Sequence, residues 1–299
     1  MKRPLVSRIF QLDSGRLRAG WRALLFFIFS AGLASLFLGL FDSLSPFVRK
    51  PFFIEGSLLL LTVLLSESAF RWLDGEGTLG LLPTLQKIKE GFKGVLWGGG
   101  SLLLSALPAL LLGAISPGDG LAERLASSFT LTGAFLLFTI AALMEEVVFR
   151  GYVFRTLAKG ITIWGAMAIS AFLFSFVHWA QVAGNPPVLF GLFATNVLLA
   201  GWWMGRLYIR TGNLWMAWWA HMAWNYTQGT VLGVAVSGTG IGSGDRASTL
   251  SGLVLLTGGD IGIEASIPGL FVLIALVWWE ERLAFKADRT PKASSLSHP

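Results

Sequence analysis

Apolar segments of roughly twenty residues recur through this sequence, and short polar stretches separate them. A helix of that length rises roughly 30 Å, which matches the hydrocarbon thickness of a bilayer. Charged residues make up 13% of the chain, about half the share that is usual in soluble domains. The pattern predicts an all-α fold, a polytopic membrane helix bundle with about eight transmembrane helices. The expected spans are 21–41, 52–70, 94–115, a fourth that starts near Phe129, 161–179, 188–208, 214–236 and 261–279.

Polar ends flank a single bundle. We expect a basic cytoplasmic arm over residues 1–20, one transmembrane bundle over 21–280 and a basic tail over 281–299. The first apolar segment is too long for a signal peptide and has no small-residue cleavage site, so it reads as a retained span. Basic residues concentrate in alternate connections, which favours cytoplasmic placement of both termini. This also accounts for the net charge of +6, so nucleic acid is not an expected partner.

The chain has no cysteine. Disulfides, thiolate metal sites, iron–sulfur clusters and a cysteine nucleophile are therefore excluded together.

Two adjacent carboxylates, Glu145 and Glu146, follow the apolar run that begins near Phe129. Ionisable groups within a membrane are costly, at about 3 kcal/mol or more near the bilayer centre, and usually mark a functional site. Arg150 follows Glu146 at i+4 in the favourable acid-first order, so we expect these two to form a structural pair. Adjacent helical residues point about 100° apart. Glu145 is therefore the carboxylate that remains available to a cavity.

Two histidines lie inside later spans. His178 is in the fifth expected span, while His221 is in the seventh, with Asn225 one helical turn beyond it on the same face. Glu145 lies about 15 residues before the turn at 159–160, and His178 about 18 residues after it, so both sit roughly 22–27 Å from that turn. The spacing predicts that these side chains meet, provided that the fourth helix is unusually long.

The chemistry of this set indicates hydrolysis. A carboxylate and an imidazole without an evident serine or cysteine partner suit activation of water. His221 and Asn225 can both donate hydrogen bonds to a developing oxyanion. The set therefore indicates cleavage of an acyl bond, most naturally a peptide bond. Nothing independent supports Ser175 as a nucleophile, and Asn196 is expected to form an interhelical hydrogen bond.

Three short motifs carry a family resemblance. Glu145–Arg150 matches EExxxR, Phe174–His178 matches FxxxH, and His221–Asn225 matches HxxxN. In this order and on separate spans, they resemble the CPBP family of intramembrane proteases, which includes the type II CAAX prenyl proteases and bacteriocin-processing proteins. The resemblance covers about residues 129–230.

The resemblance implies a glutamate-dependent intramembrane endopeptidase without a cofactor. Glu145 and His178 would activate water, and His221 and Asn225 would form the oxyanion site. The other motif residues would support them: Glu146, Arg150 and Phe174. The implied substrate is a membrane-associated peptide or protein, prenylated or bacteriocin-like, and the implied location is a prokaryotic inner membrane.

Three alternatives stay open at this point. Glu145, His178 and His221 could ligate zinc, since two histidines and one carboxylate form a known catalytic set, although the HExxH signature is absent. A non-catalytic immunity or scaffold protein could use the same cavity to bind a partner. A transporter with a proton-relay Glu/His pair is disfavoured, because no matched pair of interrupted spans is evident.

Overall fold

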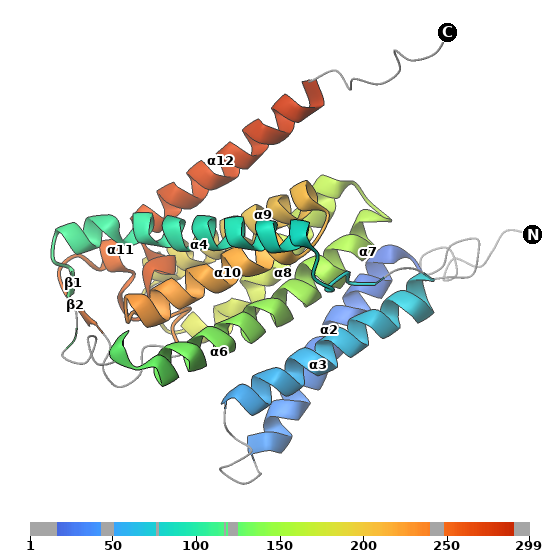
Figure 1. Ribbon diagram of the computed structural model, residues 1–299, viewed down its shortest axis with the longest axis horizontal. Helices are drawn as coiled ribbons and strands as arrows, with labels where there is room; N and C mark the ends of the chain where they lie inside the picture. Colours follow the sequence, from blue (N-terminus) through green and yellow to red (C-terminus); the bar gives the residue numbers. More distant parts are fainter. Residues whose placement is uncertain are drawn as a thin grey trace, which may run out of the picture.

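The computed structural model describes residues 17–42, 51–75, 78–116, 118, 125–239 and 248–289. Most of these residues are helical, which confirms the predicted all-α membrane fold (Figure 1). Six helices in the described part of the chain are long and apolar enough to cross a membrane, so the expected count of eight is not confirmed. The six segments are Ala19–Leu36, Gly56–Asp74, Leu85–Leu111, Thr130–Ala158, Ile163–Val182 and Pro187–Thr211.

The first two helices lie side by side along one flank of the bundle (Figure 1). They are α2 (Ala19–Asp42) and α3 (Pro51–Ala69), and α3 continues into a π-helical turn over Phe70–Asp74. The buried Arg22 side chain of α2 donates to the Asp74 carboxylate. This ion pair ties the start of α2 to the end of the α3 segment.

Helix α4 (Leu85–Leu111) begins earlier than the expected third span. Thr84 caps it by accepting a hydrogen bond from the Lys87 amide, as N-cap threonines do. Gly94 and Gly98 let α4 approach the backbone of α10 (Trp215–Tyr226), because a Cβ at Gly98 would lie 2.0 Å from the Ala220 carbonyl oxygen. The close α4–α10 contact fixes the helix that carries His221.

One long helical run crosses the bundle. The predicted meeting of Glu145 and His178 requires a helix of this kind. It consists of α6 (Ser128–Glu146), a π-helical segment over Val147–Phe154 and α7 (Arg155–Ala158). At about 1.5 Å per residue the run exceeds roughly 40 Å, which is longer than the hydrocarbon layer. The prediction of an unusually long fourth helix is confirmed. The π-helical segment begins directly after the glutamate pair, and such segments often occur at functional sites.

Helix α8 (Ile163–His178) is followed by a 3-10 turn over Trp179–Val182, and then by α9 (Pro187–Thr211). A Cβ at Gly201 of α9 would lie 3.1 Å from the Ala171 Cα of α8. Small residues therefore allow close packing of the two helices inside the bundle.

The last two expected spans differ from the structure. α10 has 12 residues and ends in a π-helical turn over Thr227–Val231. α12 (Ile267–Arg289) begins six residues later than expected and continues into the predicted tail. Residues 258–266 instead form two 3-10 turns, Gly259–Ile261 and Ile263–Ala265. Gly258 and Gly262 have φ values of 78° and 100°, which a helix cannot accommodate.

The described residues of the expected loop 237–259 include regular structure. β2 (Thr249–Leu250) pairs antiparallel with β1 (Ile115–Ser116), and a short helix α11 (Val254–Thr257) follows. The non-helical segment 258–266 packs against α9, where Asn196 donates from Nδ2 to the carbonyls of Glu264 and Ser266 at 2.9 and 3.0 Å. Irregular backbone inside a membrane bundle is tolerated where it is buried or lines a cavity.

Candidate active site

The glutamate pair at the end of α6 points in two directions. Glu146 is fully buried, and its Oε1 accepts a hydrogen bond from Arg150 Nη1 at 2.8 Å. Arg150 Nη2 donates to the Gly201 carbonyl of α9 at 2.9 Å. The Arg150 guanidinium also lies 4.5 Å from the ring centre of Phe174 on α8. The predicted i,i+4 pair is thus present, and it joins three helices.

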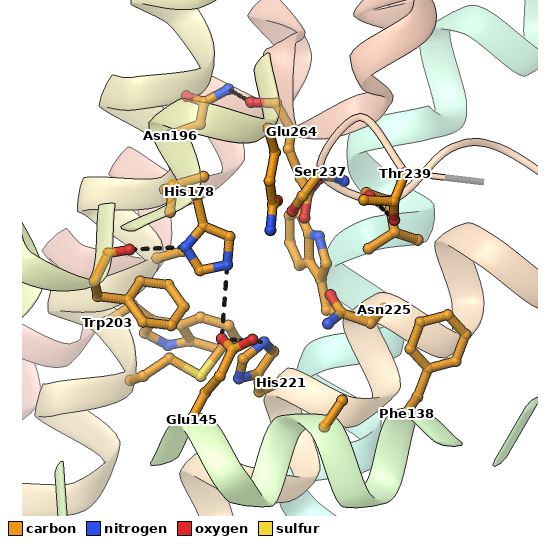
Figure 2. Close-up of a pocket in the computed structure, with 18 of the residues that line it drawn as sticks. Phe138, Glu145, His178, Asn196, Trp203, His221, Asn225, Ser237, Thr239 and Glu264 are labelled. Carbon is orange, nitrogen blue, oxygen red and sulfur yellow. Dashed lines mark hydrogen bonds and ion pairs between the residues drawn. The ribbon is translucent and has the colours of Figure 1, made fainter. Parts of the chain in front are cut away.

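Glu145 faces a cavity instead. Its side chain is 26% exposed, and its Oε2 lies 3.7 Å from His178 Nε2 and 3.8 Å from His221 Nε2. Oε2 is itself buried without a hydrogen-bond partner. One carboxylate oxygen therefore lies between two imidazoles brought together from α8 and α10 (Figure 2).

The tautomer of His178 follows from its other ring nitrogen. Nδ1 lies 2.8 Å from the Phe174 carbonyl oxygen, which can only accept, so Nδ1 carries the proton. In the neutral ring, Nε2 then presents its lone pair toward Glu145. The Phe174 ring also packs against both imidazoles, with ring centres 4.9 Å from His178 and 5.8 Å from His221. Phe174 therefore orients the site through both its backbone and its ring.

His221 is held by the second glutamate. Its Nδ1 lies 3.1 Å from Glu146 Oε1, within hydrogen-bonding distance. From the sequence, Glu146 was paired with Arg150 alone. The contact with His221 was missed because the two residues are far apart in the chain and their spacing does not indicate it. The carboxylate that neutralises Arg150 also orients the His221 ring.

Glu145, His178 and His221 line a cavity of about 130 Å³. Asn225 lies one turn beyond His221 on α10, and in Figure 2 its amide points into the space beside that imidazole. Glu146 and Arg150 do not line the cavity; they are buried behind the residues that do. The predicted site residues that line the cavity are Glu145, Phe174, His178, His221 and Asn225.

Sequence reasoning missed Glu264, which lines the same cavity from the 3-10 segment. Its Oε2 accepts hydrogen bonds from the backbone amide of Ser237 at 2.5 Å, from Ser237 Oγ at 3.1 Å and from Gln228 Nε2 at 3.4 Å. Burial raises the pKa of this carboxyl above its ordinary value, while the hydrogen bonds from Ser237 and Gln228 act in the opposite direction. The sequence did contain a signal for Glu264, because an ionisable residue within an apolar membrane segment usually marks a functional site.

Two further residues have simple structural roles. Asn196 makes the expected hydrogen bonds between elements, although its partners lie in the non-helical segment. Ser175 Oγ donates to the Ala194 carbonyl and accepts from the Trp179 indole, so its hydroxyl is engaged away from the cavity.

Metal binding was one of the alternatives. Within the part of the chain that the structure describes, no group of three or more histidine or carboxylate side chains is arranged to hold a metal ion. The Glu145, His178 and His221 set is the one to be tested for zinc.

The fold and the buried Glu–His cavity define an integral membrane protein with the features of an intramembrane peptidase. Residues 127–227 match the family model described as Type II CAAX prenyl endopeptidase Rce1-like. The match contains all three motifs, which confirms the resemblance read from them. No curated protein and no solved structure matches the chain.

Proposed function

We propose that this protein is a glutamate-dependent intramembrane endopeptidase that hydrolyses a peptide bond with activated water. The observation that carries the proposal is the position of Glu145 Oε2, buried without a hydrogen-bond partner within 3.8 Å of two imidazole nitrogens. A general base of this kind must lie within reach of the water proton that it abstracts.

The first step places water between Glu145 and His178. Their separation of 3.7 Å is too long for a direct hydrogen bond. A water that bridges the two groups can donate one proton toward the Glu145 carboxylate and the other toward His178 Nε2. Glu145 takes a proton as the water oxygen attacks the substrate carbonyl, and it later delivers that proton to the leaving amine.

The second step stabilises the tetrahedral oxyanion. Asn225 can donate from its amide, and His221 can donate from Nε2 when both of its ring nitrogens carry protons. Glu146 on the Nδ1 side and Glu145 on the Nε2 side both favour that cationic form. Glu146 therefore acts as a positioning residue for His221.

The substrate that fits this setting is a membrane-associated peptide or protein, prenylated or bacteriocin-like. Its support is the family match together with the apolar lining that α6 contributes to the cavity through Leu137, Phe138 and Ala141. We place the protein in a prokaryotic inner membrane with both termini cytoplasmic, on the distribution of basic residues.

A comparison of membrane proteomes tests the proposal. Cells that express the wild type should contain a cleavage fragment that is absent from cells that express Glu145→Gln. Asp260→Asn is the matched control, because it removes an exposed carboxylate that does not line the cavity. If Glu145→Ala and His178→Ala both retain full biological activity at normal expression, proteolysis is not the function, and the immunity or scaffold alternative replaces it.

Zinc hydrolysis is the second candidate, because Glu145, His178 and His221 supply the donor types of a site with two histidines and one carboxylate. The purified protein is treated with a chelator, and cleavage of the identified substrate is measured. Retained cleavage supports metal-free chemistry. Loss of cleavage that Zn²⁺ restores would overturn it.

A further inference from the structure

Glu264 is a carboxylate of the candidate active site that the proposed water chemistry does not use. It lines the same cavity as Glu145. In Figure 2, Glu264 and Ser237 lie across that cavity from Glu145 and His221. Water activation and oxyanion binding are assigned to other residues of the lining. The role of this second carboxylate is therefore separate from the chemical steps.

The Glu264 carboxyl group is held in place through one of its two oxygens. Oε2 accepts from the Ser237 amide at 2.5 Å, from Ser237 Oγ at 3.1 Å and from Gln228 Nε2 at 3.4 Å. Ser237 has a φ of 49°, a left-handed conformation that is uncommon for residues other than glycine. Paired backbone hydrogen bonds between Val236 and Thr239 close the turn around it. Three donors from fixed elements therefore set the orientation of the carboxyl group.

The other oxygen, Oε1, is available to a bound molecule. Among the described residues, no donor is hydrogen-bonded to it. It is also not one of the fully buried side-chain atoms without a partner, a set that does include Glu145 Oε2. Glu264 keeps 9% of its surface exposed and lines the cavity. A molecule in the cavity can therefore reach Oε1.

The cavity reaches the protein surface beside Glu264. Gln181 lines the cavity and is exposed. Its backbone lies against the turn that contains Ser237, because a Cβ at Gly238 would lie 3.2 Å from the Gln181 carbonyl oxygen. Ser237 and Thr239 are half-buried and line the cavity from the same turn. A peptide that enters here passes Glu264 before it reaches Glu145.

The charge of the lining favours a cationic ligand. Two carboxylates line the cavity, those of Glu145 and Glu264, and no lysine or arginine does so. Within the described part of the chain, no basic side chain forms an ion pair with Glu264. A buried carboxylate is stable in its ionised form when a cation pairs with it. Hydrogen bonds from an ammonium or guanidinium group are stronger than neutral ones. A basic side chain of the bound peptide would supply the cation.

We propose that Glu264 forms a substrate subsite that binds the ammonium or guanidinium group of a basic residue in the peptide. Glu264 Oε1 accepts from that group, while neighbouring residues of the peptide lie along the apolar lining of α6 and reach Glu145. Glu264 thus determines specificity and does not activate water. The inference rests on the proposed function for its peptide ligand, and it adds the type of residue that the peptide carries near the cleaved bond.

The test measures binding, so that its outcome does not depend on cleavage. It uses the purified full-length Glu145→Gln variant in neutral detergent micelles, which leaves Glu264 as the one carboxylate of the cavity lining. The probes are short, fluorescently labelled, leucine- and alanine-rich peptides that differ at one central residue, which is lysine, norleucine or glutamate. Fluorescence polarisation should show that the lysine peptide binds about tenfold more tightly than the norleucine peptide, and that the glutamate peptide binds most weakly. Equal affinities for the lysine and norleucine peptides would overturn the proposal.

Variants locate the effect. In Glu145→Gln/Glu264→Gln, the affinity for the lysine peptide should fall to that of the norleucine peptide, which should itself stay unchanged. Micelle partitioning cancels, because each peptide is compared with itself. The control Glu145→Gln/Asp260→Asn removes an exposed carboxylate outside the cavity and should keep the lysine preference. A preference that survives Glu264→Gln would overturn the assignment.

A second variant covers the case in which Glu145→Gln/Glu264→Gln does not melt cooperatively. Glu145→Gln/Gln181→Lys places a positive charge at the exposed position beside Glu264. It should weaken binding of the lysine peptide and leave the norleucine peptide unaffected, and an unchanged affinity for the lysine peptide would overturn the subsite. Cleavage is scored separately, as the Glu145-dependent fragment in the membrane proteome. Absence of that fragment beside an intact lysine preference would overturn the peptidase function and still support the subsite.

Discussion

Glu146 Oε1 lies 3.1 Å from His221 Nδ1, so the second glutamate of the EExxxR motif orients the histidine of the HxxxN motif. The same oxygen accepts from Arg150 at 2.8 Å, and Arg150 reaches the Gly201 carbonyl of α9. A single buried carboxylate therefore connects α6 to the helix that carries the expected oxyanion donors. The adjacent glutamates have separate roles. Glu145 faces the cavity, while Glu146 orients His221, which lines it.

Replacement of Glu146 by alanine should destabilise the protein by on the order of 3–5 kcal/mol, because it leaves the Arg150 guanidinium buried without its partner. A fall in the melting temperature in detergent measures the effect. The double variant Glu146→Ala/Arg150→Met should recover part of the loss, since no unpaired charge remains buried. A double variant no more stable than the single variant would contradict the ion-pair explanation.

Replacement of Glu145 by glutamine should act on cleavage and leave stability unchanged. The side chain is 26% exposed in the cavity and its Oε2 makes no hydrogen bond, so the fold does not depend on its charge. Removal of a general base lowers the rate by roughly 10²–10⁴-fold. Substrate turnover and melting temperature are measured on the same sample. A large fall in melting temperature would mean that Glu145 has a structural role.

The sequence alone was sufficient to predict those contacts that follow from the spacing of residues along one helix or across one turn. The Glu146–Arg150 pair follows from the i,i+4 rule. The approach of Glu145 to His178 follows from counting residues on either side of one turn, because two antiparallel helices rise equally from it. The long helix that this count required is present in the structure.

Contacts between distant segments could not be read in this way. The bond from Glu146 to His221 depends on how α10 packs against α6, which helical periodicity does not report. Glu264 was placed in an expected span because the apolar run around it is nearly continuous. The positive φ angles of Gly258 and Gly262 interrupt that run and turn the carboxylate toward the cavity.

Substitution of Gly98 by alanine should separate α4 from α10. The added Cβ would lie 2.0 Å from the Ala220 carbonyl oxygen, and this contact is with rigid backbone directly before His221. Overpacking of this kind costs typically about 1–3 kcal/mol. We expect a lower melting temperature and slower cleavage together.

Gly100→Ala is the matched control for that experiment. A Cβ at this position meets nothing within 4 Å, and alanine is the better helix former by up to about 1 kcal/mol. The control variant should melt at the wild-type temperature or slightly above it. Equal destabilisation by the two substitutions would show that the α4–α10 contact is not the cause.

The carboxyl of Glu264 should make the stability of the protein depend on pH. Burial raises its pKa in the folded state above the reference value of 4.5, so the folded protein binds more protons than the unfolded chain above that pH. The free energy of unfolding then falls as pH rises from 4.5 through the folded-state pKa, and this contribution is fully present only below 4.5. The charged or titratable groups that line the same cavity are Glu145, His178 and His221.

Glu264→Gln mimics the protonated carboxyl and keeps an oxygen that can accept from the Ser237 amide. Melting curves recorded between pH 4.5 and 8 should therefore show a weaker fall with pH for this variant than for the wild type. Asp260→Asn, which removes an exposed carboxylate four residues away, should keep the wild-type slope. Parallel curves for the wild type and Glu264→Gln would contradict the assignment, because the pH dependence would then arise from the other groups of the cavity.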